Sequence, residues 1–366
     1  MSAKINLKCA HRIYKKAVRL ARLNEENTRD KKLFDILERD KNNVFNNLKR
    51  CKNSASQSAT QKLYVDGLIY EGDMVADGFF ESMKKLKTCD FEELAHDPDL
   101  AVHFSNYEHI RQLCNEQRSL PEISCEQVHK ILKRMKRDVK DHYGITALHY
   151  LNAGVEGTIH VKELINCIIS NPINATTKEM NTVHGLILHK GHNKDKTSER
   201  SYRTISSCPV LSKVLDIYIR DLNQDKWDSC QASTQYQGRG TSHELAALLL
   251  TEVIQHSLFI LDKPVYILAL DAQSAFDRCL SQILVCELYK AGIDGGAIAL
   301  IDNRLRNRAT VYDWNGTLVG PASDMTGFEQ GGVNSSDYYK LYNNEQLVTA
   351  QRSQLGVLYM VSLFQQ

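Results

Sequence analysis

The sequence predicts an α+β fold in which a helical N-terminal region precedes a domain that mixes strands and helices. Residues 4–52 place apolar residues among many Lys, Arg and Asn and contain neither Pro nor Gly, which is typical of long charged helices. Residues 185–207 have the pattern of a strand, a polar turn and a second strand. Asn315-Gly316 lies between alternating apolar residues, which is the strongest short signal for a β-hairpin.

The composition is that of a globular protein with an unevenly charged chain. Of the 366 residues, 42% are hydrophobic and 25% are charged. The formal net charge is only +2, yet residues 1–55 hold fifteen Lys or Arg against six Asp or Glu. A basic helical arm, residues 1–60, fits a polyanionic partner such as nucleic acid. The alternative is a pair of solvated helices.

The ten cysteines are dispersed with no Cys-x-x-Cys pair, so neither a zinc knuckle nor a redox motif is supported. The N-terminus has no apolar signal core, and no run approaches the ~18 apolar residues that a membrane-spanning helix needs. We therefore expect an intracellular chain with reduced thiols and no membrane partner. The sequence does not distinguish nucleus from cytoplasm.

Residues 61–175 are predicted to form a helical linker region. Its first helix carries Phe79, Phe80 and Met83 at core-like spacing. Its second helix has six Lys or Arg on one face, for which solvation is the simplest explanation. The four helices expected here span residues 63–86, 128–140, 144–151 and 161–169.

The following part of the chain alternates strands and helices. Residues 185–191 predict a short apolar strand followed by a basic turn that contains Lys190. After a polar tip a second strand begins at Tyr202 and carries Arg203. A hairpin is expected about Asn315-Gly316. Helices are predicted for residues 210–222, 244–258, 280–291 and 297–308.

Three segments of this part have the residue types of a binding site. The apolar strand Val265–Leu270 ends in Asp271, and a carboxylate there suits a hard cation such as Mg²⁺, although it also suits a helix cap. The loop of residues 235–243 is not a nucleotide P-loop, because no Gly-Lys-Ser/Thr follows, and Ser242 is its expected helix cap. Glycines in residues 327–336 allow close approach of the backbone to a ligand.

Four motifs follow one another in the order found in reverse transcriptases. They are Lys190/Arg203, Gln237–Ser242, Asp271/Phe276 and Gln330/Gly331. Through these motifs residues 176–357 resemble the reverse transcriptase (RNA-directed DNA polymerase) of non-LTR, LINE-type retrotransposons. The sequence departs from that family at three positions where the family usually has Pro, which here are His189, Thr204 and Ser336.

The resemblance implies a partial right-hand polymerase, with fingers and an incomplete palm, that acts on an RNA template, a DNA primer and deoxynucleoside triphosphates. Asp271 would be the catalytic carboxylate and a ligand of Mg²⁺ or Mn²⁺, and Phe276 would block a 2′-hydroxyl. Lys190 and Arg203 would grip the triphosphate, a role that suits a point charge and a planar fork. The other nucleotide-binding residues implied are Ala272, Gln330 and Gly331.

The family's third metal-binding motif, an aromatic-x-Asp-Asp hairpin, is expected beyond residue 357. Residues 358–366 read instead as an atypical, truncated tail, and the sequence contains no Asp-Asp pair. Because in-line phosphoryl transfer uses two metals held close together, we expect the chain as written to be an inactive polymerase fragment. The alternatives are a non-catalytic nucleic-acid-binding remnant of a retroelement and a polymerase of the group II intron or telomerase type.

Deleting residues 1–55 is expected to lower the affinity for RNA and DNA without changing sequence preference, because their excess positive charge displaces counterions from phosphates. Filter-binding titrations at several salt concentrations measure the effect as a shallower dependence of affinity on salt. An unchanged salt slope would identify the arm as solvated helices only.

Overall fold

The computed structural model describes residues 60–116, 120–136, 139–171, 176–191, 194–229, 242–267, 272, 274–345 and 348. All of them belong to one of the two units into which the chain divides, residues 60–366. Four sequence-based predictions fall outside the described residues. They concern the basic arm up to residue 59, the loop residues 237–241, Asp271 and the tail 358–366.

The described part of the chain is α+β, as the sequence predicts. Its strands are β1 (Lys62–Val65), β2 (Leu68–Glu71), β3 (Thr182–His189), β4 (Tyr202–Ser207), β5 (Ala309–Trp314) and β6 (Thr317–Ser323). Its earlier helices are α3 (Val75–Lys87), α4 (Phe91–Ala95), α5 (Pro98–Glu116), α6 (Cys125–Arg134), α7 (Ala147–Asn152), α8 (Gly154–Ser170) and α9 (Lys178–Asn181). Its later helices are α10 (Val210–Ser229), α11 (His243–Gln255), α12 (Ser281–Lys290), α13 (Gly295–Arg306) and α14 (Ser335–Tyr342).

A four-stranded sheet with the order β4-β3-β5-β6 lies at the centre of this part. β3 runs antiparallel to β4 and parallel to β5, so the strand–turn–strand prediction for residues 185–207 is confirmed. β5 and β6 form the predicted hairpin. Asn315 and Gly316 have φ of 53° and 91°, the positive values that a tight two-residue hairpin turn requires.

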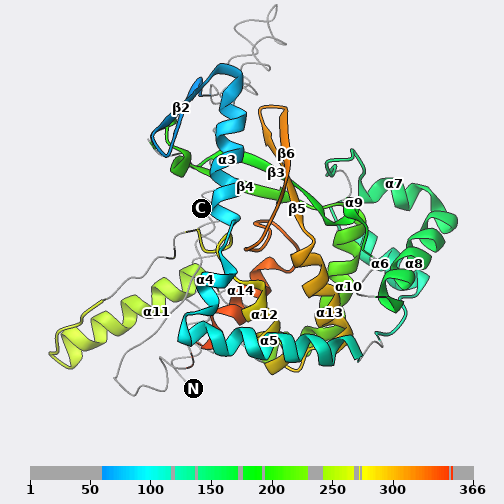
Figure 1. Cartoon of the computed structure of the whole chain (residues 1–366). Helices are drawn as coiled ribbons and strands as arrows, with labels where there is room; N and C mark the ends of the chain where they lie inside the picture. Colours follow the sequence, from blue (N-terminus) through cyan, green and yellow to red (C-terminus); the bar gives the residue numbers. More distant parts are fainter. Residues whose placement is uncertain are drawn as a thin grey trace, which may run out of the picture. The chain divides into compact units, whose positions relative to one another are not determined.

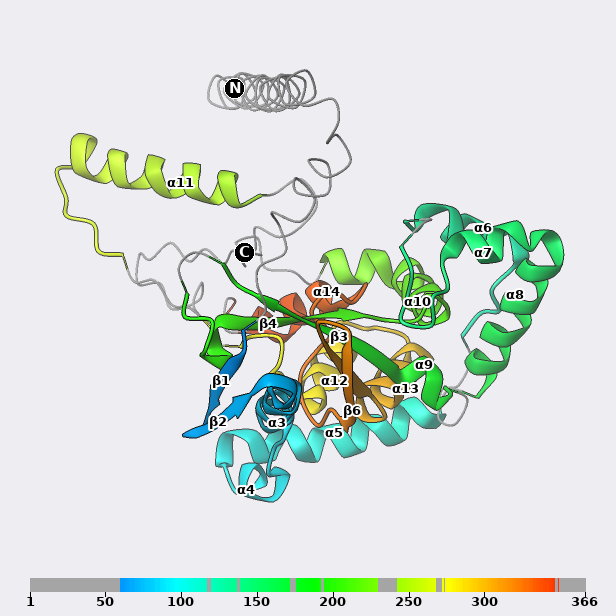
Figure 2. The ribbon, with the colours of Figure 1, turned by 90° about the horizontal axis from the view of Figure 1, so that it is seen from above.

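Helix α3 covers one face of this sheet (Figures 1 and 2). The ring of Phe79 on α3 is centred 4.6 Å from the rings of both Tyr202 on β4 and Trp314 on β5. Because side chains alternate along a strand, Arg203, the residue after Tyr202, points to the opposite face. The sheet therefore separates an aromatic core from the side that carries Arg203.

Helices α5 to α10 and α12 to α14 form a second apolar core. Helix α5 packs along α12 and α13 in both views (Figures 1 and 2). The hydroxyl of Tyr107 on α5 donates a 3.0 Å hydrogen bond to Asp302 on α13, 195 residues away. Segments from the predicted linker region thus belong to the same core as the later helices. No helix in the part of the chain that the structure describes is long and apolar enough to cross a lipid bilayer.

The helix predicted for residues 63–86 is wrong over its first part, where the chain forms the β1–β2 hairpin. Asp66 and Gly67 turn this hairpin with φ of 48° and 82°. Asp-Gly is a strong signal for a two-residue hairpin turn, and it outweighs the apolar spacing on which the helix was predicted. The second part of the prediction is confirmed as α3, which carries Phe79, Phe80 and Met83.

The other predicted elements are mostly confirmed, with two corrections. The helix predicted to run to residue 140 is α6, which ends at Arg134 because Met135 adopts extended backbone with ψ of 154°. Of the strand predicted for Val265–Leu270, residues 265–267 are described, and they form no strand. Ser242 caps α11 as predicted, since its hydroxyl accepts a 3.3 Å hydrogen bond from the amide of Leu245.

A buried charge cluster joins α3 to the ends of β5 and β6. Asp324 Oδ2 accepts hydrogen bonds from Lys87 Nζ at 3.0 Å, Arg308 Nε at 2.8 Å and Thr310 Oγ1 at 2.6 Å. The four residues are between 1% and 4% exposed. Burial by itself raises the pKa of Asp324, but the charges of Arg308 and Lys87 lower it by more. The pKa is therefore lowered overall, and the carboxylate stays ionised.

Asp324→Asn is expected to lower the free energy of unfolding by ~3–5 kcal/mol, because it leaves two buried cations without their carboxylate. Since the folded-state pKa of Asp324 is lowered, its contribution to the stability of the fold is present above about pH 4. That contribution is lost as the pH falls below this value. The matched control is Asp66→Asn, which breaks the exposed pair with Lys85 and is expected to cost less than ~1 kcal/mol. Denaturant titrations measure the free energy of unfolding of both variants. A small loss of similar size in the two variants would contradict the prediction.

Candidate functional site

Lys190 follows directly after β3, at the turn that leads to β4. Its amide donates a 2.8 Å hydrogen bond to the carbonyl of Ser201, which keeps the ends of the two strands together. Its ammonium group is exposed and donates a 2.9 Å hydrogen bond to the carbonyl of Arg200. Burial of part of the side chain, with the charges of Lys194 and Arg203, lowers the pKa of Lys190. The turn carries four basic residues and the two acidic residues Asp195 and Glu199, and among the described residues no carboxylate forms an ion pair with Lys190.

Arg203 lies on β4 opposite Leu188 of β3, on the sheet face away from α3. Its side chain is half-buried, and its Nε is a buried donor without a hydrogen-bond partner. No carboxylate of the described residues forms an ion pair with it. By contrast, Arg304 and Arg308 are each paired with a buried aspartate. A half-buried guanidinium without a counter-charge has donors free to bind an anion.

The Gln330-Gly331 turn packs directly against the strand that carries Arg203. The amide of Ser206 on β4 donates a 2.7 Å hydrogen bond to the carbonyl of Gln330. Gly331 has φ of 104°, and a Cβ at this position would lie 3.1 Å from the carbonyl oxygen of Ser206. Glycine is thus needed both for the backbone conformation and for the close approach. Two of the predicted motifs, separated by more than a hundred residues in the sequence, meet here.

Residues 276–279 run beside the segment just before that turn. Phe328 N donates to the carbonyl of Phe276 and Gly327 N to that of Cys279, both at 2.7 Å. Thr326 Oγ1 donates a 2.8 Å hydrogen bond to the carbonyl of Asp277. Three hydrogen bonds therefore bring the segment that follows Asp271 in the sequence to the Gln330-Gly331 turn.

Phe276 and Asp277 differ in what their side chains contact. The half-buried ring of Phe276 is centred 5.2 Å from the ring of Tyr339 on α14 and packs against the helical core. Burial raises the pKa of Asp277, and the charges of Lys87 and Arg308 offset part of the effect. Asp277 does not cap the next helix, because α12 begins after Leu280 without a side-chain cap.

The predicted metal ligand is not placed by the structure, because Asp271 lies outside the described residues. Its neighbour Ala272 is described and exposed. Within the described ranges, no group of three His, Cys, Asp or Glu side chains is arranged to hold a metal ion. The structure thus brings together Lys190, Arg203, Phe276, Gln330 and Gly331, and leaves Asp271 as a prediction.

The sequence did not reveal the residues that fix the segment leading into the Gln330-Gly331 turn. They are Lys87, Arg308, Asp324, Thr326 and Glu329. Lys87 ends a helix, where a lysine is ordinary, and Asp324 precedes the motif by a few residues. The closest signal is the repeated arginine at positions 304, 306 and 308, since clustered charge in an apolar stretch needs carboxylate partners.

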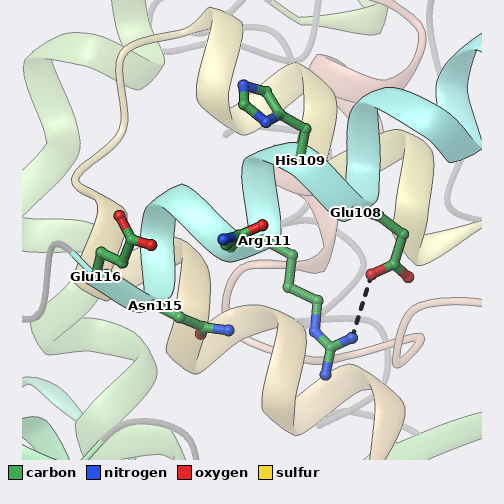
Figure 3. A pocket seen from close by; sticks show the side chains of 6 residues that line it. Glu108, His109, Arg111, Asn115 and Glu116 are labelled. Carbon is green, nitrogen blue, oxygen red and sulfur yellow. Dashed lines mark hydrogen bonds and ion pairs between the residues drawn. The ribbon is translucent and has the colours of Figure 1, made fainter.

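Two cavities lie elsewhere in the described part. Figure 3 shows a pocket of about 610 Å³ along α5, where Arg111 reaches Glu108 at 3.5 Å. Its described lining is polar, belongs to one helix and holds none of the predicted site residues. The second cavity, of about 10 Å³, lies between α10, α13 and α14 and is lined by Arg304, Glu329 and Asn334 among others. It has room for a single water molecule.

No family model matches the chain, and a search of curated proteins finds no similar one.

Gly327→Ala is expected to destabilise the protein by ~2–5 kcal/mol, because Gly327 has φ of 88° and a Cβ there would lie 2.7 Å from the carbonyl oxygen of Asp277. The matched control is Gly292→Ala, where φ is 71° but no atom lies within 4 Å, so only the backbone term of ~1–2 kcal/mol remains. Chemical denaturation of the two variants measures the difference. Equal losses of stability in the two variants would mean that Gly327 does not closely approach the backbone of Asp277.

Proposed function

We propose that this chain is part of an RNA-directed DNA polymerase of the retrotransposon type and that residues 176–345 bind the incoming deoxynucleoside triphosphate. The observation that carries the proposal is the half-buried guanidinium of Arg203, which has no carboxylate partner among the described residues. It lies on the strand against which the Gln330-Gly331 turn packs. An anion seated there would supply the missing counter-charge.

The surroundings favour a triphosphate over a simple anion. Lys190 and Arg203 together offer a point charge and a planar fork, which suit several phosphoryl oxygens at once. Lys190 has a lowered pKa, partly through Arg203, so a bound polyanion stabilises its charged form. Gln330 belongs to this turn and in the proposal would contact the sugar or the base. The backbone of Phe276 is held beside the turn by Phe328, while its ring packs against Tyr339 in the helical core.

In this proposal the other components follow from the family that the motifs resemble. Asp271 would hold Mg²⁺ or Mn²⁺, which neutralises charge on the phosphates during transfer. An RNA template and a DNA primer would be the macromolecular partners. The chain's own described residues contribute the binding and orientation of the triphosphate and of the segment that carries Phe276.

Arg203→Gln is expected to weaken binding of a deoxynucleoside triphosphate with Mg²⁺ ~10- to 100-fold, since a hydrogen bond to a charged group contributes ~1.5–3 kcal/mol. The matched control is Arg200→Gln, because Arg200 lies in the same turn with a side chain that is 81% exposed. It should change the affinity less than ~2-fold. Equilibrium titration with a fluorescent triphosphate measures both.

Equal weakening in the two variants would contradict a specific role for Arg203. A parent protein that binds RNA or DNA with a steep salt dependence, yet binds no triphosphate, would refute the proposal. That result would support a non-catalytic nucleic-acid-binding remnant instead.

A further inference from the structure

Arg308 reaches four groups of one short segment, residues 324–329. Its Nε donates to Asp324 Oδ2 at 2.8 Å, and its Nη2 donates to the carbonyls of Thr326 and Gly327, both at 2.9 Å. Its Nη1 lies 3.6 Å from Glu329 Oε1. A single guanidinium, only 2% exposed, therefore fixes the path of the chain over six consecutive residues.

That segment leads directly into the Gln330-Gly331 turn. Glu329 precedes the turn, and its carboxylate lies among the charges of Arg304 and Arg308, which lower its pKa against the effect of burial. The carbonyl of Gln330 in this turn accepts the hydrogen bond from the amide of Ser206, which lies three residues after Arg203 on β4. A continuous set of contacts thus runs from Arg308 to the strand of the unpaired arginine.

We propose that Arg308 is a positioning residue, which sets the Gln330-Gly331 turn against β4 and so shapes the nucleotide site without touching the nucleotide. The role in binding rests on the proposed function, whereas the placement of the turn does not. Lysine cannot replace Arg308 in this role. Its ammonium can keep the ion pair with Asp324, but it lacks the planar fork that serves two backbone carbonyls and Glu329 together.

This difference separates positioning from general support of the fold. Arg308→Met removes the charge and leaves Asp324 and Glu329 short of a partner, so both stability and affinity should fall. Arg308→Lys restores the charge and should recover most of the melting temperature. If Arg308 only supports the fold, the lysine variant should recover affinity for the triphosphate together with stability. If Arg308 positions the turn, the lysine variant should recover stability but not affinity.

The experiment uses the full 366-residue chain with Arg308→Lys and, as matched control, Arg306→Lys. Arg306 lies two residues earlier and donates a 3.1 Å hydrogen bond to Asp302, away from the segment 324–329. The first measurement is hydrogen exchange at the amides of Ser206, Gly327 and Phe328, whose bonds define the placement of the turn. The second is titration with a fluorescent deoxynucleoside triphosphate and Mg²⁺.

We expect Arg308→Lys to speed exchange at these three amides and to weaken triphosphate binding ~10-fold, because a displaced site loses orientation. Arg306→Lys should leave both within ~2-fold of the parent. Unchanged exchange in a folded Arg308→Lys variant would overturn the inference. Faster exchange with unchanged affinity would overturn its link to nucleotide binding. If the parent binds no triphosphate, the proposed function fails, and exchange alone decides the positioning role.

If the Arg308 variants do not fold, Glu329→Gln takes their place. It keeps the side-chain shape and every bond from Arg308 to the backbone, but it removes the charge that Nη1 faces. Faster exchange at Ser206 would support the inference, and protection equal to that of the parent would overturn it.

Discussion

Asp324 accepts three hydrogen bonds through one buried carboxylate oxygen, and the arrangement of the sheet and its loops depends on this interaction. Lys87 comes from the end of α3, Arg308 follows α13, and Thr310 lies on β5. Burying these charges is costly unless they meet, so breaking the cluster is strongly destabilising. This interaction joins the helix that covers one sheet face to the segment that leads into the Gln330-Gly331 turn.

Four arginines of the described part differ in their partners. Arg304 and Arg306 at the end of α13 and Arg308 just after it are each paired with a different aspartate, which is Asp216, Asp302 and Asp324 in turn. Arg203 is half-buried as well, yet no carboxylate of the described residues reaches it. The three paired arginines fix helices and loops in place, whereas Arg203, with a buried Nε that has no hydrogen-bond partner, keeps the capacity to bind an anion. The proposed site follows from this contrast.

About half of the candidate site was predictable. Lys190 and Arg203 stand out because they flank a strand–turn–strand, and the glycines of residues 327–332 mark a close backbone approach. The supporting residues were not predictable, since Lys87 at the end of α3 and Arg308 just after α13 are ordinary until their buried carboxylate is known. Asp271 lies outside the described residues, so its part in the site stays a prediction.

The sequence by itself determined the local elements, because their signals are backbone preferences within a few residues. Asn315-Gly316 turns one hairpin and Ser242 caps one helix wherever the rest of the chain lies. Only the tertiary structure decided that Gln330 lies against Ser206 and that Asp324 meets Lys87, 237 residues away. Those contacts depend on the burial of charge and on the close approach of backbones, which no local pattern in the sequence specifies.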